Sequence, residues 1–133
     1  MGSTSQHLSV SIDRPAAEVY ALAADPLNLP RWAGGLAGSE VEWDGEQWST
    51  ESPMGRVRFT FAPPNDLGVL DHDVTLPSGE TVHNPLRVIP DGEGCEVVFT
   101  LRRRAGMTDD ELERDAAAVA KDLATLKELA EGR

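Results

Sequence analysis

The chain has 133 residues, of which 40% are hydrophobic and 26% are charged, as in a globular domain with a core of its own. Its formal net charge of −11 repels phosphate backbones and anionic lipids, so we expect neither nucleic acid nor a membrane as a partner. The single cysteine, Cys95, excludes an intrachain disulfide.

The start of the chain lacks the basic and apolar segments of a signal peptide. No apolar run approaches the ~20 residues that a membrane span requires. We therefore expect a cytoplasmic protein with one domain over residues 6–131 and flexible termini at 1–5 and 132–133.

The first quarter of the chain predicts one strand and two helices. Residues 7–12 alternate polar and apolar side chains, which is typical of a half-buried strand. Pro15 then suits the first turn of a helix over 16–24. That helix ends at Asp25-Pro26, because a residue before proline avoids the helical region. A short helical segment follows over 27–32.

Residues 39–103 change to a period of two. The pattern predicts six strands, at 39–43, 46–52, 55–62, 69–76, 81–89 and 95–102. The segments between them contain the Gly, Pro, Asn and Asp residues that turns require. Because these connections are short, we expect neighbouring strands to be antiparallel.

A long C-terminal helix is the clearest element of the sequence. Thr108 and Glu111 have the spacing of a capping box, which starts a helix. An apolar stripe then runs for about 22 residues along one helical face. The stripe consists of Leu112, Ala116, Val119, Leu123, Leu126 and Ala130.

The order of elements, with three local motifs, resembles the START-like helix-grip superfamily (SRPBCC). The motifs are Ser-Ile-Asp-Arg-Pro-Ala-Ala-Glu-Val-Tyr at 11–20, Asp25-Pro26, and Leu-Pro-Arg-Trp at 29–32. The superfamily includes lipid carriers, birch-pollen-allergen-like proteins, polyketide cyclases/dehydrases and chaperone activators. The resemblance implies an α+β fold in which a seven-stranded curved antiparallel sheet wraps the C-terminal helix and encloses an apolar pocket. A fold shared by so many functions does not choose among them.

Strand parity and one turn place a polar pair inside the pocket. Pro77-Ser78-Gly79 matches a three-residue hairpin loop, which sets Val74 opposite Val82 and His72 opposite Asn84. Both polar side chains then share the inner face with apolar neighbours. Buried polar groups need hydrogen-bond partners, which here are each other, water or a ligand.

These considerations give the candidate ligand-binding residues. The set combines the polar pair with the aromatic side chains expected on inner faces or at the mouth of the pocket. It consists of Trp32, Trp43, Trp48, Phe59, Phe61, His72, Asn84 and Phe99. His72 is also the candidate catalytic acid or base, since its ordinary pKa near 6.5 suits proton transfer. Each of these residues has a structural alternative as part of an ordinary core.

We expect no metal site and no cofactor. Asp71 and His72 are adjacent on a strand and point to opposite faces, so they cannot readily hold one ion. Asp71, Asp73 and His83 form a weaker option on the outer face, better explained as a solvated acidic edge. The sequence contains neither a phosphate-binding loop nor a cysteine pair for zinc.

Three hypotheses for function follow. The favoured one is binding of a small hydrophobic or aromatic molecule. The alternatives are an enzyme of the polyketide cyclase/dehydrase type that uses His72, and a protein-interaction module. A homodimer is possible. Arg102, Arg103 and Arg104 form the only basic cluster, as a solvated strand end or a docking point.

Overall fold

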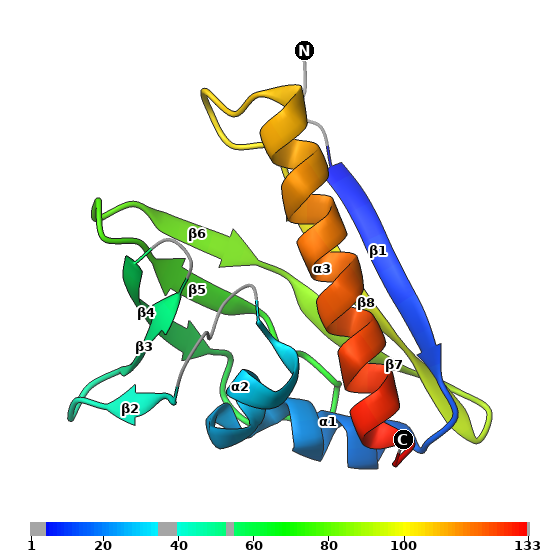
Figure 1. Ribbon diagram of the computed structural model, residues 1–133. Coiled ribbons are helices and arrows are strands. Elements are labelled where there is room, and N and C mark those ends of the chain that lie inside the picture. The colour runs from blue at the N-terminus through cyan, green and yellow to red at the C-terminus, as the bar shows by residue number, and fades with distance from the viewer. Residues whose placement is uncertain (1–4, 35–39, 53–54, 133) are drawn as a thin grey trace.

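The computed structural model describes residues 5–34, 40–52 and 55–132 (Figure 1). In chain order the elements are β1 (Ser5–Ile12), α1 (Ala16–Ala24), the 3₁₀ turn η1 (Pro26–Asn28), α2 (Leu29–Trp32), β2 (Glu42–Trp43), β3 (Trp48–Ser52), β4 (Gly55–Phe61), β5 (His72–Thr75), β6 (Thr81–Asn84), β7 (Leu86–Asp91), β8 (Gly94–Arg102) and α3 (Asp109–Ala130). The predicted α+β architecture is confirmed. Within the described ranges, no helix is both long and apolar enough to cross a bilayer.

The long helix α3 starts where the capping box predicted. The Glu111 amide donates to Thr108 Oγ1 at 3.1 Å, and the Thr108 amide donates to Glu111 Oε1 at 2.9 Å. At the other end, Lys127 Nζ donates to the Ser11 carbonyl at 2.7 Å. Both ends of α3 are thus fixed by hydrogen bonds, the second of them to β1, beside which α3 runs in Figure 1.

The strands of the described chain form two antiparallel sheets, with orders β1-β8-β7 and β2-β3-β4-β5-β6. This differs from the single seven-stranded sheet that we expected, because the predicted strand at 81–89 is divided at Pro85 into β6 and β7. Proline has no N–H and cannot continue a ladder on both sides. β7 pairs with β8, whereas β6 pairs with β5. From the end of β6 back towards its start, β6 and β8 diverge (Figure 1).

The hairpin between β5 and β6 has the predicted register. His72 faces Asn84 and Val74 faces Val82 across the pair. The turn is closed by a bond from the Gly79 amide to the Leu76 carbonyl at 2.9 Å, and Gly79 has a φ of +93°. The polar pair therefore lies where strand parity placed it.

The core collects side chains from both sheets and from the helices. α1 and α2 contribute Val19, Ala23, Leu29 and Trp32; the sheets contribute Val57, Phe59, Leu86, Val88 and Val97; the segment before β5 contributes Leu70; α3 contributes Leu123 and Leu126. Cys95 is also buried, and burial raises the pKa of its thiol, which favours the inert protonated form.

A glycine brings the two sheets together. The Gly68 carbonyl accepts from the Val88 amide at 2.9 Å, and the Leu70 amide donates to the Leu86 carbonyl at 2.8 Å. Gly68 has a φ of +74°, and a Cβ at this position would lie 2.1 Å from the Val88 carbonyl oxygen. The lead-in to β5 can approach β7 this closely only because residue 68 has no side chain.

We expect Gly68→Ala to destabilise the fold by about 3 kcal/mol or more, since it adds a backbone collision to the strain of a positive φ. The matched control is Gly79→Ala. Gly79 also has a positive φ, but a Cβ there meets nothing within 4 Å, so the expected cost is about 1 kcal/mol. Urea denaturation measures both values. Equal losses for the two variants would show that the contact with Val88 is not a constraint.

Candidate functional site

A cavity of about 390 Å³, here called the main cavity, lies where the two sheets diverge. Its walls come from the β5–β6 hairpin, the end of β8 and the face of α3 opposite them. The lining residues are His72, Val74, Leu76, Glu80, Thr81, Val82, His83, Asn84, Phe99, Leu101, Arg102, Arg104, Asp115, Ala118, Val119 and Asp122. This volume falls in the lower part of the range for small-molecule sites.

A smaller space of about 50 Å³, here called the side cavity, adjoins the main cavity beneath α2. It adds walls from α2, β4, β7 and α3, namely Leu29, Trp32, Ala33, Phe61, Leu86 and Leu123. The two cavities share His72, Phe99, Val119 and Asp122. These four residues therefore mark the junction between the two spaces.

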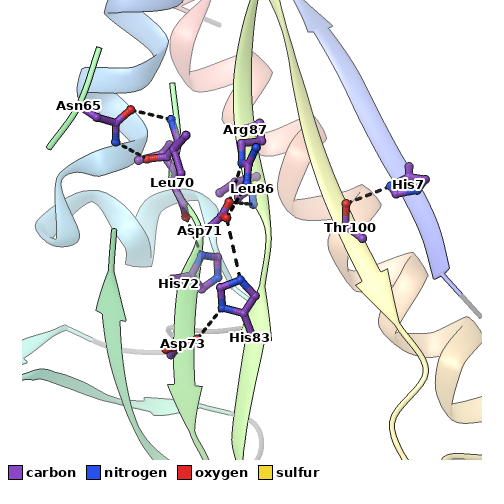
Figure 2. Close-up of polar contacts among 11 residues, drawn as sticks. His7, Asn65, Leu70, Asp71, His72, Asp73, His83, Leu86, Arg87 and Thr100 are labelled. Atoms are coloured by element: carbon purple, nitrogen blue, oxygen red, sulfur yellow. Dashed lines mark hydrogen bonds and ion pairs between the residues drawn. The ribbon is translucent and has the colours of Figure 1, made fainter. Parts of the chain in front are cut away.

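His72 is held at the junction by its own strand. Its side chain is buried, with 7% exposed, and its Nδ1 lies 3.0 Å from the Leu70 carbonyl oxygen (Figure 2). The imidazole stacks on Phe61, with ring centroids 4.8 Å apart and planes inclined by 24°. A carbonyl oxygen only accepts, so Nδ1 carries the hydrogen, and Nε2 of the neutral ring carries the lone pair. The sequence did not point to Leu70 as the partner.

Burial lowers the pKa of His72 from its ordinary value of 6.5. The hydrogen bond to the Leu70 carbonyl and the charge of Asp71 favour the protonated ring, but they only partly offset the loss of solvent. His72 is therefore neutral near pH 7 and offers an acceptor, not a charge.

The other predicted site residues divide into two groups. Trp32 and Phe61 line the side cavity, Asn84 lines the main cavity, and Phe99 lines both. Trp32 is 6% exposed, and among the described side chains its Nε1 is the buried polar atom that lacks a hydrogen-bond partner.

Three predicted residues lie outside both cavities. Phe59 is fully buried in the core. Trp43 faces Trp48 across the β2–β3 pair, in an edge-to-face contact with centroids 5.4 Å apart, and it is 55% exposed. The structure thus brings five of the predicted residues together around the junction and leaves the β2–β3 tryptophans apart from them.

Charged residues around the main cavity were missed in the sequence analysis. Asp115 and Asp122 flank Val119 on the face of α3 that lines the cavity. Their spacing of four and three residues from Val119 would have placed them beside the apolar stripe. Burial raises the pKa of Asp115 from its ordinary value, which favours the protonated carboxyl.

The basic cluster serves more than one purpose. Arg103 donates to the Met107 carbonyl and pairs with Asp109, so it fastens the loop before α3. Arg104 pairs with Glu80 at 3.4 Å. Since Arg104 follows β8 and Glu80 precedes β6, this ion pair joins the two strands that diverge around the main cavity. Arg102 lines the same cavity and is exposed.

The acidic edge on the outer face is an ion-pair network (Figure 2). Arg87 donates to both Asp71 carboxylate oxygens, at 2.8 and 2.7 Å, and holds the pKa of that carboxyl below its ordinary value. His83 Nδ1 lies 2.7 Å from Asp73 Oδ1. In the ranges that the structure describes, no group of three or more His, Cys, Asp or Glu side chains could hold a metal ion.

Comparisons with known proteins point to one family. The sequence profile described as "Polyketide cyclase / dehydrase and lipid transport" matches residues 4–131. No curated protein matches the chain in sequence.

Solved structures share the fold at low sequence identity. DynU16, a protein in the dynemicin biosynthetic locus, is 16% identical, with a TM-score of 0.72 over 97% of this chain and 48% of that chain. Ara h 8.0201 is 9% identical, with a TM-score of 0.68 over 99% and 100% of the two chains. An AHSA1-like protein from Rhizobium etli is 22% identical, with a TM-score of 0.66 over 99% and 84%. Identities this low establish the fold alone.

The buried imidazole makes stability depend on pH. Because burial lowers the folded-state pKa of His72, the unfolded chain binds more protons as the pH falls below about 6.5, and the free energy of unfolding declines. We expect an NMR titration to give His72 a pKa below 6.5, with the signal assigned by its loss in His72→Gln. We also expect the stability of His72→Gln to decline less between pH 7 and pH 5. A titration at or above 6.5 would contradict the buried, neutral ring.

Proposed function

The chain belongs to the polyketide cyclase/dehydrase and lipid transport family, within the helix-grip superfamily that its sequence resembles, and from this premise we propose that it binds a small hydrophobic or aromatic molecule in the main cavity. The observation that carries the proposal is a space of about 390 Å³ bounded by both sheets and α3. Seven apolar residues and nine polar or charged residues line it, so a ligand there meets apolar surface together with groups that can fix its orientation.

The arrangement of the walls supports entry between β6 and β8. β6 pairs with β5, whereas β7 pairs with residues 94–99 of β8. Backbone hydrogen bonds join the two sheets at Gly68 and Leu70. The sheets separate along β6, on the N-terminal side of Pro85. The Arg104–Glu80 pair lies at the far end of this gap, where the polar end of a bound molecule would meet charged side chains and water.

A cyclase or dehydrase activity is the second candidate, and one observation favours it. His72 and Asp115 line the same cavity, and burial shifts their pKa values in opposite directions. A neutral imidazole serves as a base, and a carboxyl whose pKa is raised holds its proton more readily than an ordinary aspartate does, which are the two roles that proton transfer to and from carbon requires. The same pair is compatible with binding alone.

A protein-interaction module has less support. It would require a contiguous exposed apolar patch. Among the described residues, the large hydrophobic side chains that are most exposed are Leu27, Trp43, Leu67 and Ile89. They belong to η1, β2, the loop before β5 and β7, so they come from four separate segments of the chain.

Filling the main cavity should abolish binding without unfolding the protein. Ala118 is exposed on α3 and lines the cavity, so the ring of Ala118→Trp can occupy the space that a ligand needs. The matched control is Ala117→Trp, on an exposed residue of the same helix that does not line the cavity. A wild-type ligand at 100 times its dissociation constant adds about 2.7 kcal/mol of stability, visible as a thermal shift of several degrees.

A panel of naphthalenes, flavonoids, fatty acids and sterols tests this prediction. We expect shifts for the wild type and for Ala117→Trp, and none for Ala118→Trp. Ligands that stabilise all three proteins equally would place binding elsewhere. The absence of any shift for the wild type across the panel would count against a ligand-binding function.

Turnover of a poly-β-ketone by the purified protein would distinguish the enzyme from the carrier. If the protein is a cyclase or dehydrase, His72→Gln should lower kcat by about 10²-fold or more while the ligand remains bound, because removing a general base leaves confinement intact. Equal turnover by the two proteins would exclude His72 as the catalyst. Product analysis by chromatography measures the rate, and the thermal shift measures binding.

A further inference from the structure

The junction of the two cavities presents hydrogen-bond acceptors to whatever fills it. Of the four residues that the cavities share, Phe99 and Val119 are apolar, and His72 and Asp122 are polar. Apolar walls reward burial of any hydrophobic molecule. Within the junction, discrimination among such molecules therefore depends on His72 and Asp122.

His72 is fixed as an acceptor by three contacts. The Leu70 carbonyl takes the Nδ1 hydrogen, while Phe61 and Phe99 lie against the ring, with centroids 4.8 and 6.3 Å away. Turning the ring over would replace the Nδ1 hydrogen bond with a C–H contact, and moving the proton to Nε2 would set the Nδ1 lone pair against the carbonyl lone pairs. Nε2 is consequently the ring nitrogen left for a ligand, and in the neutral ring it only accepts.

The neighbouring polar groups complement this acceptor. The Asp122 carboxylate, which has an interaction of its own within the chain, repels a second anion and favours donors. On the side cavity, the buried Trp32 Nε1–H lacks an acceptor. A hydroxyl group can donate its hydrogen to Nε2 of His72, which an ether, ester or carbonyl oxygen cannot do.

We infer that the cavity selects hydrophobic molecules that carry a hydroxyl group, and that this hydroxyl donates a hydrogen bond to Nε2 of His72. The inference rests on the proposed function and names the chemical class of its ligand. An ether, an ester or a quinone carbonyl brings a lone pair against the lone pair of Nε2. A fatty acid carboxylate brings its charge towards Asp122. A plain hydrocarbon fits the walls but leaves Nε2 without a donor.

Three probes of similar shape test the inference: 2-naphthol, 2-methoxynaphthalene and naphthalene. Titration calorimetry, or the intrinsic fluorescence of the probes, gives each dissociation constant. We expect the wild type to bind 2-naphthol about tenfold more tightly than 2-methoxynaphthalene, because an unsatisfied buried acceptor weakens binding by about five- to 150-fold. In His72→Phe, which removes the acceptor and keeps a ring of similar size, we expect the preference to disappear while naphthalene still binds.

The control is His7→Phe, the same substitution at an exposed histidine of β1 that contacts Thr100 and lines neither cavity. It should keep the wild-type preference. Equal affinity of the wild type for 2-naphthol and 2-methoxynaphthalene overturns the inference and leaves the proposed function standing. A preference for 2-naphthol that survives in His72→Phe has the same consequence: it overturns the inference and leaves the proposed function standing. Failure of the wild type to bind 2-naphthol also overturns the inference, and failure across the whole thermal-shift panel overturns the proposed function as well.

A measurement on the wild type covers the case in which His72→Phe does not fold. The ¹⁵N signals of the His72 imidazole should show a protonated Nδ1 and an unprotonated Nε2 in the free protein. Binding of 2-naphthol should shift the Nε2 signal towards the hydrogen-bonded position, and binding of 2-methoxynaphthalene should leave it in place. A protonated Nε2 in the free protein, or identical shifts with both probes, contradicts the inference.

Discussion

The arrangement of the two sheets depends on Pro85, which has no N–H and therefore cannot continue the pairing of strands on both of its sides. Pro85 interrupts the segment that would otherwise run as a single strand between β5 and β8, and the Thr100 amide still reaches the Pro85 carbonyl at 3.0 Å. On the β6 side of that bond, β6 is paired with β5, and β8 is paired with β1. A continuous ladder at this place would close the sheet over α3. The interruption keeps the strands apart, and the main cavity occupies the space between them.

The same interruption explains why the polar groups gather at the junction. His72 and Asn84 lie one residue from the break, opposite each other in the last pairs of the β5–β6 hairpin. Both side chains project from the face of the sheet that borders the main cavity. Burial among Phe61 and Phe99 then shifts the pKa of His72 downwards, since the protonated ring has lost its solvent. The chemistry of the site is thus a consequence of the sheet geometry.

The sequence contained most of the fold and about half of the site. Local signals were reliable where they have a direct physical cause: the capping box of Thr108 and Glu111 started α3, and the loop at Pro77-Ser78-Gly79 fixed the register of His72. The division at Pro85 was missed because alternation continued on both sides of the proline. Trp43 was expected inside from its parity, but β2 is a two-residue edge strand and leaves that residue 55% exposed. Parity decides which face a side chain takes, and it does not decide whether another element covers that face.

The lowered pKa of His72 bears on the choice between carrier and enzyme. It keeps the imidazole neutral at physiological pH, which any base requires. It also makes that imidazole a weaker base, because the factor that depresses the pKa is the cost of placing a charge in the cavity. Accepting a hydrogen bond creates no full charge, whereas abstracting a proton from carbon does. The environment of His72 therefore favours recognition of a hydroxyl group over general-base catalysis, unless a substrate brings a counter-charge of its own.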